Sequence, residues 1–251
     1  MLKALASDID GTLFFSKMKP PIKISDIQAI KKYQNAGNLF GLCSGRPKCG
    51  VINLFDEQVK PDFYVISSGA LILDRNKEVL FEQPIAFSYI YDLYNTYHQE
   101  AIVIIQSDNN DFVYKNKPEG FEDKYLMIED INDLKDHKIY GISLVFENNE
   151  ITREHNNKIS QKYPALQGYQ NENSIDIVTK GCSKGNALKK IKEIYQISSM
   201  AGIGDSYNDL PMLESVDVAF SFHNAPIELK KIVAYLVASV SEAIDILAKK
   251  G

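Results

Sequence analysis

Mainly apolar runs alternate with amphipathic stretches in the first third of the chain. Three of these runs predict strands buried in a sheet: residues 2–7, 39–43 and 63–67. Residues 25–37 place apolar side chains at helical spacing, with Ser25 as the expected N-cap and Gly37 as the expected end. Pro47 is expected to open a second helix, and residues 70–83 predict a hairpin around a polar turn.

The same order of elements returns in the last quarter of the chain. Ser183 is the expected N-cap of another amphipathic helix. The elements predicted there are a helix at 183–196, a strand at 199–204, a short helix at 209–216, a strand at 216–220 and a closing helix at 242–250. Because strands that alternate with helices form parallel sheets, both ends of the chain are predicted to share one α/β domain.

The middle of the chain, residues 83–181, has a different pattern. Phe87, Ile90 and Tyr94 lie at helical spacing, and a second helix is predicted at 151–163. Strand patterns dominate the rest of this segment: residues 101–106, 111–115, 139–146 and 174–178. Runs of strands with occasional helices predict an α+β domain inserted into the α/β domain, which then consists of residues 1–82 and 182–251.

Polar, glycine-containing turns follow the core strands. The sequences DIDGT (8–12), SGRP (44–47), SSGA (67–70) and GDSYND (204–209) each come directly after a predicted strand. Ligands of open parallel sheets bind outside the carboxyl ends of the strands. These turns are therefore expected to meet at one edge of the sheet and to form the functional site.

The first of these turns places Asp8 and Asp10 one residue apart. A calcium loop of the EF-hand type is excluded, because its twelfth position, which requires glutamate, is Lys19. A capping turn accounts for one of the carboxylates but not for both. Two carboxylates in different environments suit a nucleophile beside a general acid–base, since their pKa values can then separate.

The turn at residues 202–209 adds Asp205, Asn208 and Asp209. It fails as a dinucleotide-binding fingerprint, because Tyr207 stands at the third glycine position. A hard cation such as Mg²⁺ needs only one or two carboxylates, together with substrate phosphate and water. Asp8 and Asp205, meeting across neighbouring strand ends, are therefore a candidate Mg²⁺ site.

Two further stretches carry groups that can bind a phosphate. Ser44 and Gly45 offer a hydroxyl and backbone N–H groups at a turn. Lys180 and Lys184 offer cations, and Lys184 falls in a first helical turn, where a nearby anion has to offset the helix dipole. The residues alone do not rank the two lysines, and they make Arg46 a surface residue more readily than a ligand.

Composition excludes several classes of protein. The chain has 251 residues, 45% hydrophobic, with a net charge of -5 and no concentrated basic face for nucleic acid. No apolar run is long enough for a signal peptide or a membrane span. The histidines lie far apart, which argues against zinc. Three cysteines cannot all pair, and none belongs to a CxxC motif, so we expect a cytoplasmic protein.

The ordered motifs together resemble the haloacid dehalogenase-like (HAD) hydrolases, specifically the Cof-type branch with an inserted α/β cap. The resemblance covers the whole chain. It is carried by DxDGT at residues 8–12, the hydroxyl-Gly-Arg turn at 44–46, Lys184-Gly185 at a helix start, and GDxxND at 204–209. The implied fold is a Rossmann-like parallel-sheet core with residues 83–181 as the cap domain, which supplies substrate specificity.

The resemblance also implies a role for each motif residue. Asp8 would be the nucleophile that forms an aspartyl-phosphate, and Asp10 the general acid–base. Mg²⁺ would be held by Asp8, Asp205 and the backbone carbonyl of Asp10. Lys184 is then preferred over Lys180. The implied phosphate-binding set is Ile9, Ser44, Gly45, Lys184 and Asn208, with Asp209 in support.

Two positions depart from the family pattern. Ser68 stands where relatives usually carry asparagine near the substrate, and His223 stands where they often carry glycine. The first departure bears on substrate contacts and leaves the phosphoryl chemistry intact; His223 is expected to be a solvated loop residue.

The function expected from these residues is Mg²⁺-dependent hydrolysis of a small phosphorylated metabolite, such as a sugar phosphate. A phosphomutase-type phosphotransferase and a catalytically silent phosphometabolite-binding protein are the alternatives. No nucleic-acid or membrane partner is expected, and the oligomeric state is left open.

Overall fold

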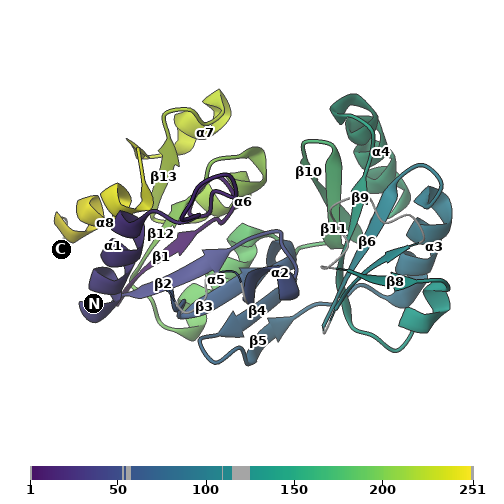
Figure 1. Cartoon of the computed structure of the whole chain (residues 1–251), viewed down its shortest axis with the longest axis horizontal. Helices are drawn as coiled ribbons and strands as arrows, with labels where there is room; N and C mark the ends of the chain where they lie inside the picture. Colours follow the sequence, from purple (N-terminus) through teal and green to yellow (C-terminus); the bar gives the residue numbers. More distant parts are fainter. Residues whose placement is uncertain (1, 53, 55–57, 109, 115–124, 250–251) are drawn as a thin grey trace.

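The computed structural model describes residues 2–52, 54, 58–108, 110–114 and 125–249. Its strands form two separate sheets, one of eight strands and one of six, which lie side by side in Figure 1. Both ends of the chain lie in the half built on the eight-stranded sheet (Figure 1). The predicted α/β class is confirmed, because both ends of the chain supply parallel strands, alternating with helices, to one sheet. The middle of the sequence forms the second sheet, between these two stretches of the core.

The larger sheet has the strand order β14-β13-β12-β1-β2-β3-β4-β5. Pairing is parallel from β14 to β3, and the last two strands form an antiparallel hairpin at one edge. The strands are β1 (Lys3–Ser7), β2 (Leu39–Cys43), β3 (Phe63–Ile66), β4 (Leu71–Asp74), β5 (Val79–Glu82), β12 (Ser199–Ile203), β13 (Val218–Phe222) and β14 (Tyr235–Val237). The central position of β1 places the end of this strand, and so Asp8, in the middle of the sheet edge.

Helices cover both faces of this sheet, as its continuous apolar strands require. On one face, Leu5 and Phe40 pack with residues of α1 (Ile24–Asn35) and α8 (Val240–Lys249). On the other, their neighbours along the strands pack against three helices: α5 (Lys184–Ile194), α6 (Leu210–Leu213) and α7 (Ile227–Ile232). Burial on both faces explains why these strands lack the apolar–polar alternation of a half-exposed sheet.

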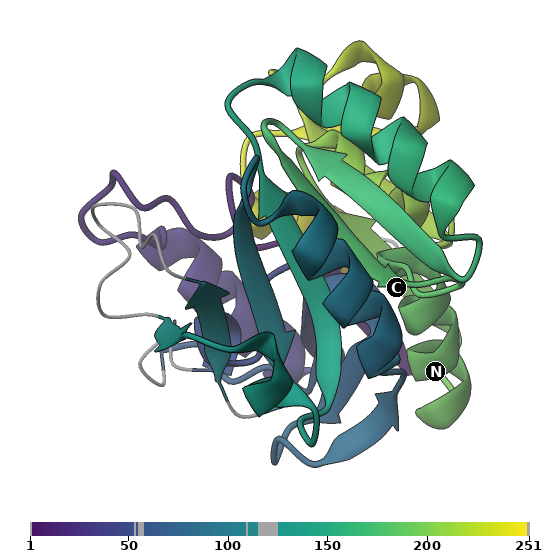
Figure 2. The ribbon, with the colours of Figure 1, turned by 90° about the vertical axis from the view of Figure 1, so that its right-hand side faces the viewer.

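The smaller sheet has the order β10-β11-β9-β6-β7-β8 and is antiparallel except for the pair β7–β8. Its strands are β6 (Ile102–Ser107), β7 (Asp111–Tyr114), β8 (Leu126–Ile128), β9 (Ile139–Val145), β10 (Leu166–Asn171) and β11 (Ser174–Thr179). Helices α3 (Phe87–Tyr97) and α4 (Asn149–Lys162) cover one face only (Figure 2). The opposite face of this sheet is turned toward the core.

Most elements lie where the apolar pattern predicts them, but several boundaries differ. Helix α1 begins at Ile24 with Lys23 as its N-cap, so the prediction of Ser25 as N-cap is wrong. The buried carboxylate of Asp26 accepts a hydrogen bond from the Ser241 backbone and fixes the start of α1 against α8. Ser183 does cap α5, accepting from the backbone N–H of Asn186.

The helix expected to open at Pro47 is the largest of these differences. The structure places α2 at Cys49–Ile52, two residues later and four residues long. The carbonyl of Pro47 accepts from Gly50, so the proline lies in a turn ahead of the helix. Such a short element contributes little dipole to the Ser44 turn.

Four elements carried too weak a signal to be predicted: α7, β8, β10 and β14. The three strands all lie at sheet edges, and β8 and β14 have only three residues each. Lys115 and Lys250, the last residues of the predicted strand 111–115 and helix 242–250, lie outside the described residues. None of the helices in the described ranges has the length and hydropathy needed to cross a bilayer.

Candidate active site

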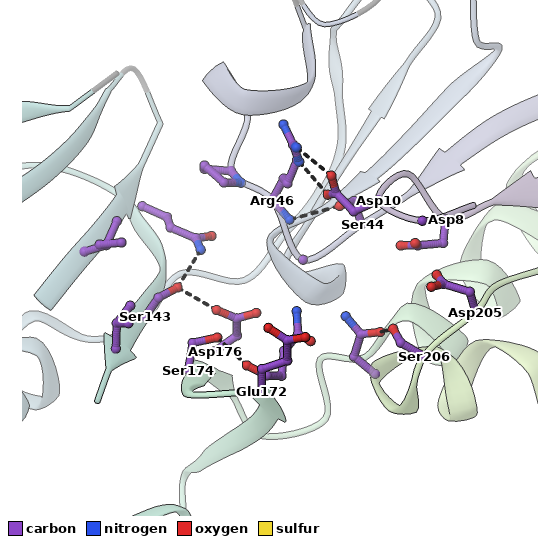
Figure 3. Close-up of a pocket in the computed structure, with 18 of the residues that line it drawn as sticks. Asp8, Asp10, Ser44, Arg46, Ser143, Glu172, Ser174, Asp176, Asp205 and Ser206 are labelled. Atoms are coloured by element: carbon purple, nitrogen blue, oxygen red, sulfur yellow. Dashed lines mark hydrogen bonds and ion pairs between the residues drawn. The ribbon is translucent and has the colours of Figure 1, made fainter. Parts of the chain in front are cut away.

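A pocket of about 510 Å³ lies between the two sheets, at the carboxyl ends of the parallel strands (Figure 3). Three of the four polar turns line it directly. The fourth, at residues 67–70, supports it, since the Ser68 backbone donates to the carbonyl of Ser44 at 3.2 Å. Core residues along the pocket include Asp8, Asp10, Gly11, Ser44, Gly45, Arg46, Pro47, Asp205, Ser206 and Asn208.

Lys184 holds two carboxylates together beneath this pocket. Its ammonium group donates to Asp8 Oδ1 at 2.7 Å and to Asp209 Oδ1 at 2.6 Å. All three side chains are buried, with exposed fractions of 2% for Lys184, 6% for Asp8 and 0% for Asp209. A lysine in a first helical turn is unfavourable against the helix dipole, and the two carboxylates supply the anions that offset it.

Burial perturbs the titration of this cluster. It raises the pKa of Asp8 to about 8, helped by the negative charge of Asp209 and opposed by Lys184. It also raises the pKa of Asp205 to about 6, again with Asp209 contributing. Burial alone lowers the pKa of Lys184, but Asp209 and Asp8 outweigh it, so the net shift is upward and the lysine stays cationic. The cluster therefore has more negative charge than one lysine can neutralise.

The donor set of this cluster fits a divalent cation. Carboxylate oxygens of Asp8, Asp205 and Asp209 lie within 4.8 Å of one another. Both oxygens of Asp209 already have partners, because Oδ1 accepts from Lys184 and Oδ2 accepts from the backbone of Asp205 and Ser206. Asp8 and Asp205 are thus the better placed ligands, and hard oxygen donors are what Mg²⁺ prefers.

Two residues of the DIDGT turn position Asp205. Thr12 donates its hydroxyl to Asp205 Oδ1 at 3.0 Å. Gly11 adopts a φ of +80°, and a Cβ built on it would lie 2.4 Å from Asp205 Oδ2. Only glycine combines this left-handed conformation with the close approach. Thr12 is a contributor that the sequence motif contained but did not assign.

Asp10 lies away from the buried cluster. Its side chain is 54% exposed, and both of its oxygens accept from the guanidinium of Arg46 at 2.6 Å (Figure 3). Arg46 also donates to the carbonyl of Gly50 and stacks over the ring of Phe14. The expectation that Arg46 is a simple surface residue is therefore wrong, because it holds the carboxylate assigned to proton transfer.

The predicted phosphate-binding residues occupy different depths. Ser44 is buried and accepts a hydrogen bond from the Arg46 backbone, while Gly45 lines the pocket directly. Asn208 also lines it and accepts from the Ser206 hydroxyl. Ile9 is fully buried in the main core, so only its backbone can contact a ligand.

The turn after β3 is strained. Ser67 and Ser68 both have positive φ, at 47° and 51°, ahead of Gly69 at 92°. Asparagine tolerates this left-handed region better than most residues, so it would suit the backbone conformation that Ser68 adopts. His223 is exposed and does not line the pocket, as expected of a loop residue.

The six-stranded sheet supplies the opposite wall of the pocket. Its contribution includes Ile104, Gln106, Ser143, Val145, Asn171, Glu172, Ser174 and Asp176, together with Tyr125. The sequence offers Asp176 and Tyr169 as cap residues that could face the site, but it assigns neither, because no local motif marks a cap residue. Tyr169 does not line the pocket; its hydroxyl donates to the carbonyl of Cys182.

The core side of this site can carry out acid–base and nucleophilic chemistry on an anion. Asp8 is buried beside a lysine, whereas Asp10 is exposed and ion-paired. The two carboxylates therefore have the different environments that separate a nucleophile from a proton carrier. Lys184 and a bound cation would concentrate positive charge where a phosphoryl group enters.

Comparison with known proteins agrees with this geometry. A family model described as haloacid dehalogenase-like hydrolase matches residues 5–245. The chain is 25% identical to the phosphoglycolate phosphatase of Staphylothermus marinus, covering 92% of this chain and 89% of that protein. It is 24% identical to 5-amino-6-(5-phospho-D-ribitylamino)uracil phosphatase YwtE of Bacillus subtilis, covering 96% and 94%. The structure of BT4131, a HAD subclass IIB sugar phosphatase, superposes with a TM-score of 0.80 at 21% identity, over 99% and 98% of the two chains.

Proposed function

Because the chain belongs to the haloacid dehalogenase-like hydrolases, we propose that it is a Mg²⁺-dependent phosphatase acting on a small phosphorylated metabolite through an aspartyl-phosphate. The observation that carries this proposal is the buried arrangement of Asp8, Lys184 and Asp209 beneath a polar pocket. A half-open pocket of this size accommodates a phosphomonoester with a small leaving group, such as a sugar phosphate.

The reaction we propose has two steps. In the first, a carboxylate oxygen of Asp8 bonds to phosphorus, the bond from phosphorus to the leaving oxygen breaks, and Asp10 gives that oxygen a proton. In the second, Asp10 accepts a proton from water as the water oxygen bonds to phosphorus, and the Asp8 carboxylate leaves with inorganic phosphate free. Ser44, Gly45, Asn208 and the Ile9 backbone are proposed to bind the phosphoryl oxygens.

The charge balance of the site explains the role of the remaining groups. Lys184 is proposed to offset charge on the phosphoryl oxygens, and its hydrogen bond to Asp209 supports a role for Asp209 in orienting that lysine. Mg²⁺, held by Asp8, Asp205 and the Asp10 backbone carbonyl, would supply further positive charge and keep Asp8 ionised against the effect of burial. Thr12 keeps Asp205 in position.

Asp10 requires a change of partner in this scheme. Its two oxygens are both bonded to Arg46, and a carboxylate in such a pair cannot donate a proton. Asp10 therefore has to leave Arg46 when substrate is bound. The pair is partly exposed, so exchanging it for water and substrate costs little.

The proposal is tested by measuring phosphate release from p-nitrophenyl phosphate and a panel of phosphorylated metabolites, with and without Mg²⁺. Asp8→Asn is expected to lower turnover by at least about a thousandfold, because it removes the nucleophile. Asp245→Asn is the matched control, since Asp245 is exposed on α8, remote from the pocket. Turnover that persists in Asp8→Asn, or that does not depend on Mg²⁺, contradicts the proposal. Isomerisation of a bisphosphorylated sugar without phosphate release indicates the mutase instead.

A further inference from the structure

The face of the six-stranded sheet that looks into the pocket is mainly polar, with Ile104 and Val145 as its apolar members. Along its strands, Ile105, Ile142 and Ile177 belong to the apolar interior of this unit, beneath α3 and α4. Side chains alternate along a strand, so Gln106 and Asp176, each next to one of these isoleucines, emerge on the opposite face, over the pocket. The apolar alternation that stabilises the cap thus also presents its polar side chains to the substrate.

Hydrogen bonds order three of these side chains across adjacent strands (Figure 3). Gln106 on β6 donates its amide to Ser143 Oγ at 3.2 Å, and Ser143 on β9 donates to Asp176 Oδ1 on β11 at 2.6 Å. Ser143 and Asp176 are direct partners in the strand register. The carboxylate of Asp176 is therefore fixed in orientation by its neighbours rather than free to choose a rotamer.

Asp176 lies next to the phosphate end of the pocket. A Cβ built on Gly45 would be 3.1 Å from Asp176 Oδ2 and 3.2 Å from Ser68 Oγ. Gly45 belongs to the turn that is proposed to bind phosphate. A carboxylate this close to the turn will face the first atoms of the leaving group once the phosphoryl group is seated.

The wall formed by the cap is rich in acceptors. Glu172, at the β10–β11 turn, adds a second carboxylate to the pocket. Gln106 is 4% exposed, and its Oε1 has no hydrogen-bond partner among the described residues. In the described ranges, the cap places no lysine, arginine or histidine along the pocket. The cations of the core are already engaged, Arg46 with Asp10 and Lys184 with Asp8 and Asp209.

We propose that the cap selects leaving groups that offer hydroxyl or ammonium donors, and that Asp176 and Glu172 reject those with a carboxylate or a second phosphate. This inference rests on the proposed phosphatase function. Like charges brought together in a partly buried site repel strongly, and such repulsion is an effective source of specificity. Donor groups on the substrate satisfy the same carboxylates, so one pair of side chains provides both attraction and exclusion.

The test compares three hexose derivatives that differ in charge: glucose 6-phosphate, glucosamine 6-phosphate and 6-phosphogluconate. Each is assayed by kcat/KM for phosphate release, or by its inhibition constant against p-nitrophenyl phosphate where it is not turned over. The wild type is expected to favour the neutral and ammonium-bearing compounds over 6-phosphogluconate by at least about tenfold. Asp176→Asn and Glu172→Gln should each reduce this preference several-fold, and Asp133→Asn, an exposed cap aspartate away from the pocket, should preserve it.

The outcomes separate the two proposals. If p-nitrophenyl phosphate is not hydrolysed by the wild type, the phosphatase function itself fails. If it is hydrolysed but 6-phosphogluconate performs as well as glucose 6-phosphate, the selection proposed for the cap is wrong. The same holds if the preference is unchanged in both variants. Glu172 is exposed, so Glu172→Gln keeps the test decisive should Asp176→Asn fail to fold.

Discussion

Replacing Asp8 with asparagine is expected to stabilise the metal-free protein while abolishing its chemistry. Burial and the charge of Asp209 raise the pKa of Asp8 from 3.8 to about 8. An upward shift means that the folded state binds the Asp8 proton more tightly than the unfolded state does. This contribution to stability is complete below the unfolded pKa of 3.8 and is lost as the pH rises through about 8. Near neutral pH the Asp8 carboxyl is ionised in the unfolded state and has to take up a proton on folding, which lowers the stability of the fold.

The size of this effect follows from the shift. Each pKa unit corresponds to about 1.4 kcal/mol, so the shift of Asp8 gives an upper bound of roughly 4–5 kcal/mol at about pH 7.5. Relaxation of the site and water entry reduce the observable gain, and we expect about 2–4 kcal/mol for Asp8→Asn. The gain should shrink at lower pH, because the unfolded-state carboxyl, whose pKa is 3.8, is then less favourably ionised and loses less free energy when it takes up a proton on folding.

Urea unfolding in EDTA, followed by circular dichroism from about pH 5 to about pH 8, measures this difference. Asp245→Asn provides the same chemical change at an exposed helix position and should stay within about 0.5 kcal/mol of wild type throughout. Added Mg²⁺ should stabilise the wild type more than Asp8→Asn, since one ligand is missing in the variant. An Asp8→Asn protein less stable than wild type, or a gain independent of pH, would refute the reasoning.

The other predictions concern Lys184, Asp10 and the binding of Mg²⁺. Lys184→Met leaves Asp8 and Asp209 buried without a cation and should lower the metal-free unfolding free energy at neutral pH by about 3–5 kcal/mol; an unchanged urea midpoint contradicts this. Asp10→Asn should slow turnover by about 10²–10⁴-fold, which steady-state kinetics measures. It should change the free energy of unfolding by less than about 1 kcal/mol, because the pair with Arg46 is exposed, and thermal melts check this. Mg²⁺ affinity, measured by calorimetry, should fall as the pH drops below about 8. Asp8 and then Asp205, whose pKa is about 6, bind protons in place of the metal. An affinity that does not change with pH contradicts this prediction.

The core of the fold was readable from the sequence because its signals are local. Buried parallel strands give continuous apolar runs, and each run ends in a turn with a distinctive composition. The start of α1 at Ile24 was not readable, because it depends on Asp26 meeting the Ser241 backbone, a contact between residues far apart in sequence. The length of α2 and the presence of the edge strand β14 were not predicted for a related reason. Short elements carry too little periodicity to be recognised in the sequence.

Part of the candidate site could likewise be predicted from the sequence, and part could not. Asp8 and Asp205 follow β1 and β12, which pair in the sheet, so the topology of a parallel sheet predicts that they meet. Lys184 opens α5 instead of following a parallel strand, and its place in the site was expected only from the family resemblance. The pairing of Arg46 with Asp10 is a side-chain choice that no spacing encodes. The Gln106–Ser143–Asp176 row requires the register of three strands, and it becomes visible only when the sheet is assembled.

The most direct test of the central claim is to find the phosphoryl group on the protein. Wild type and Asp8→Asn are mixed with Mg²⁺ and a hydrolysed substrate, quenched in acid during turnover, digested and analysed by mass spectrometry. The account predicts a phosphorylated peptide containing Asp8 in the wild type, absent from the variant and lost at the rate at which inorganic phosphate appears. Phosphate release with no modified Asp8 peptide, or with the modification on another residue, contradicts it.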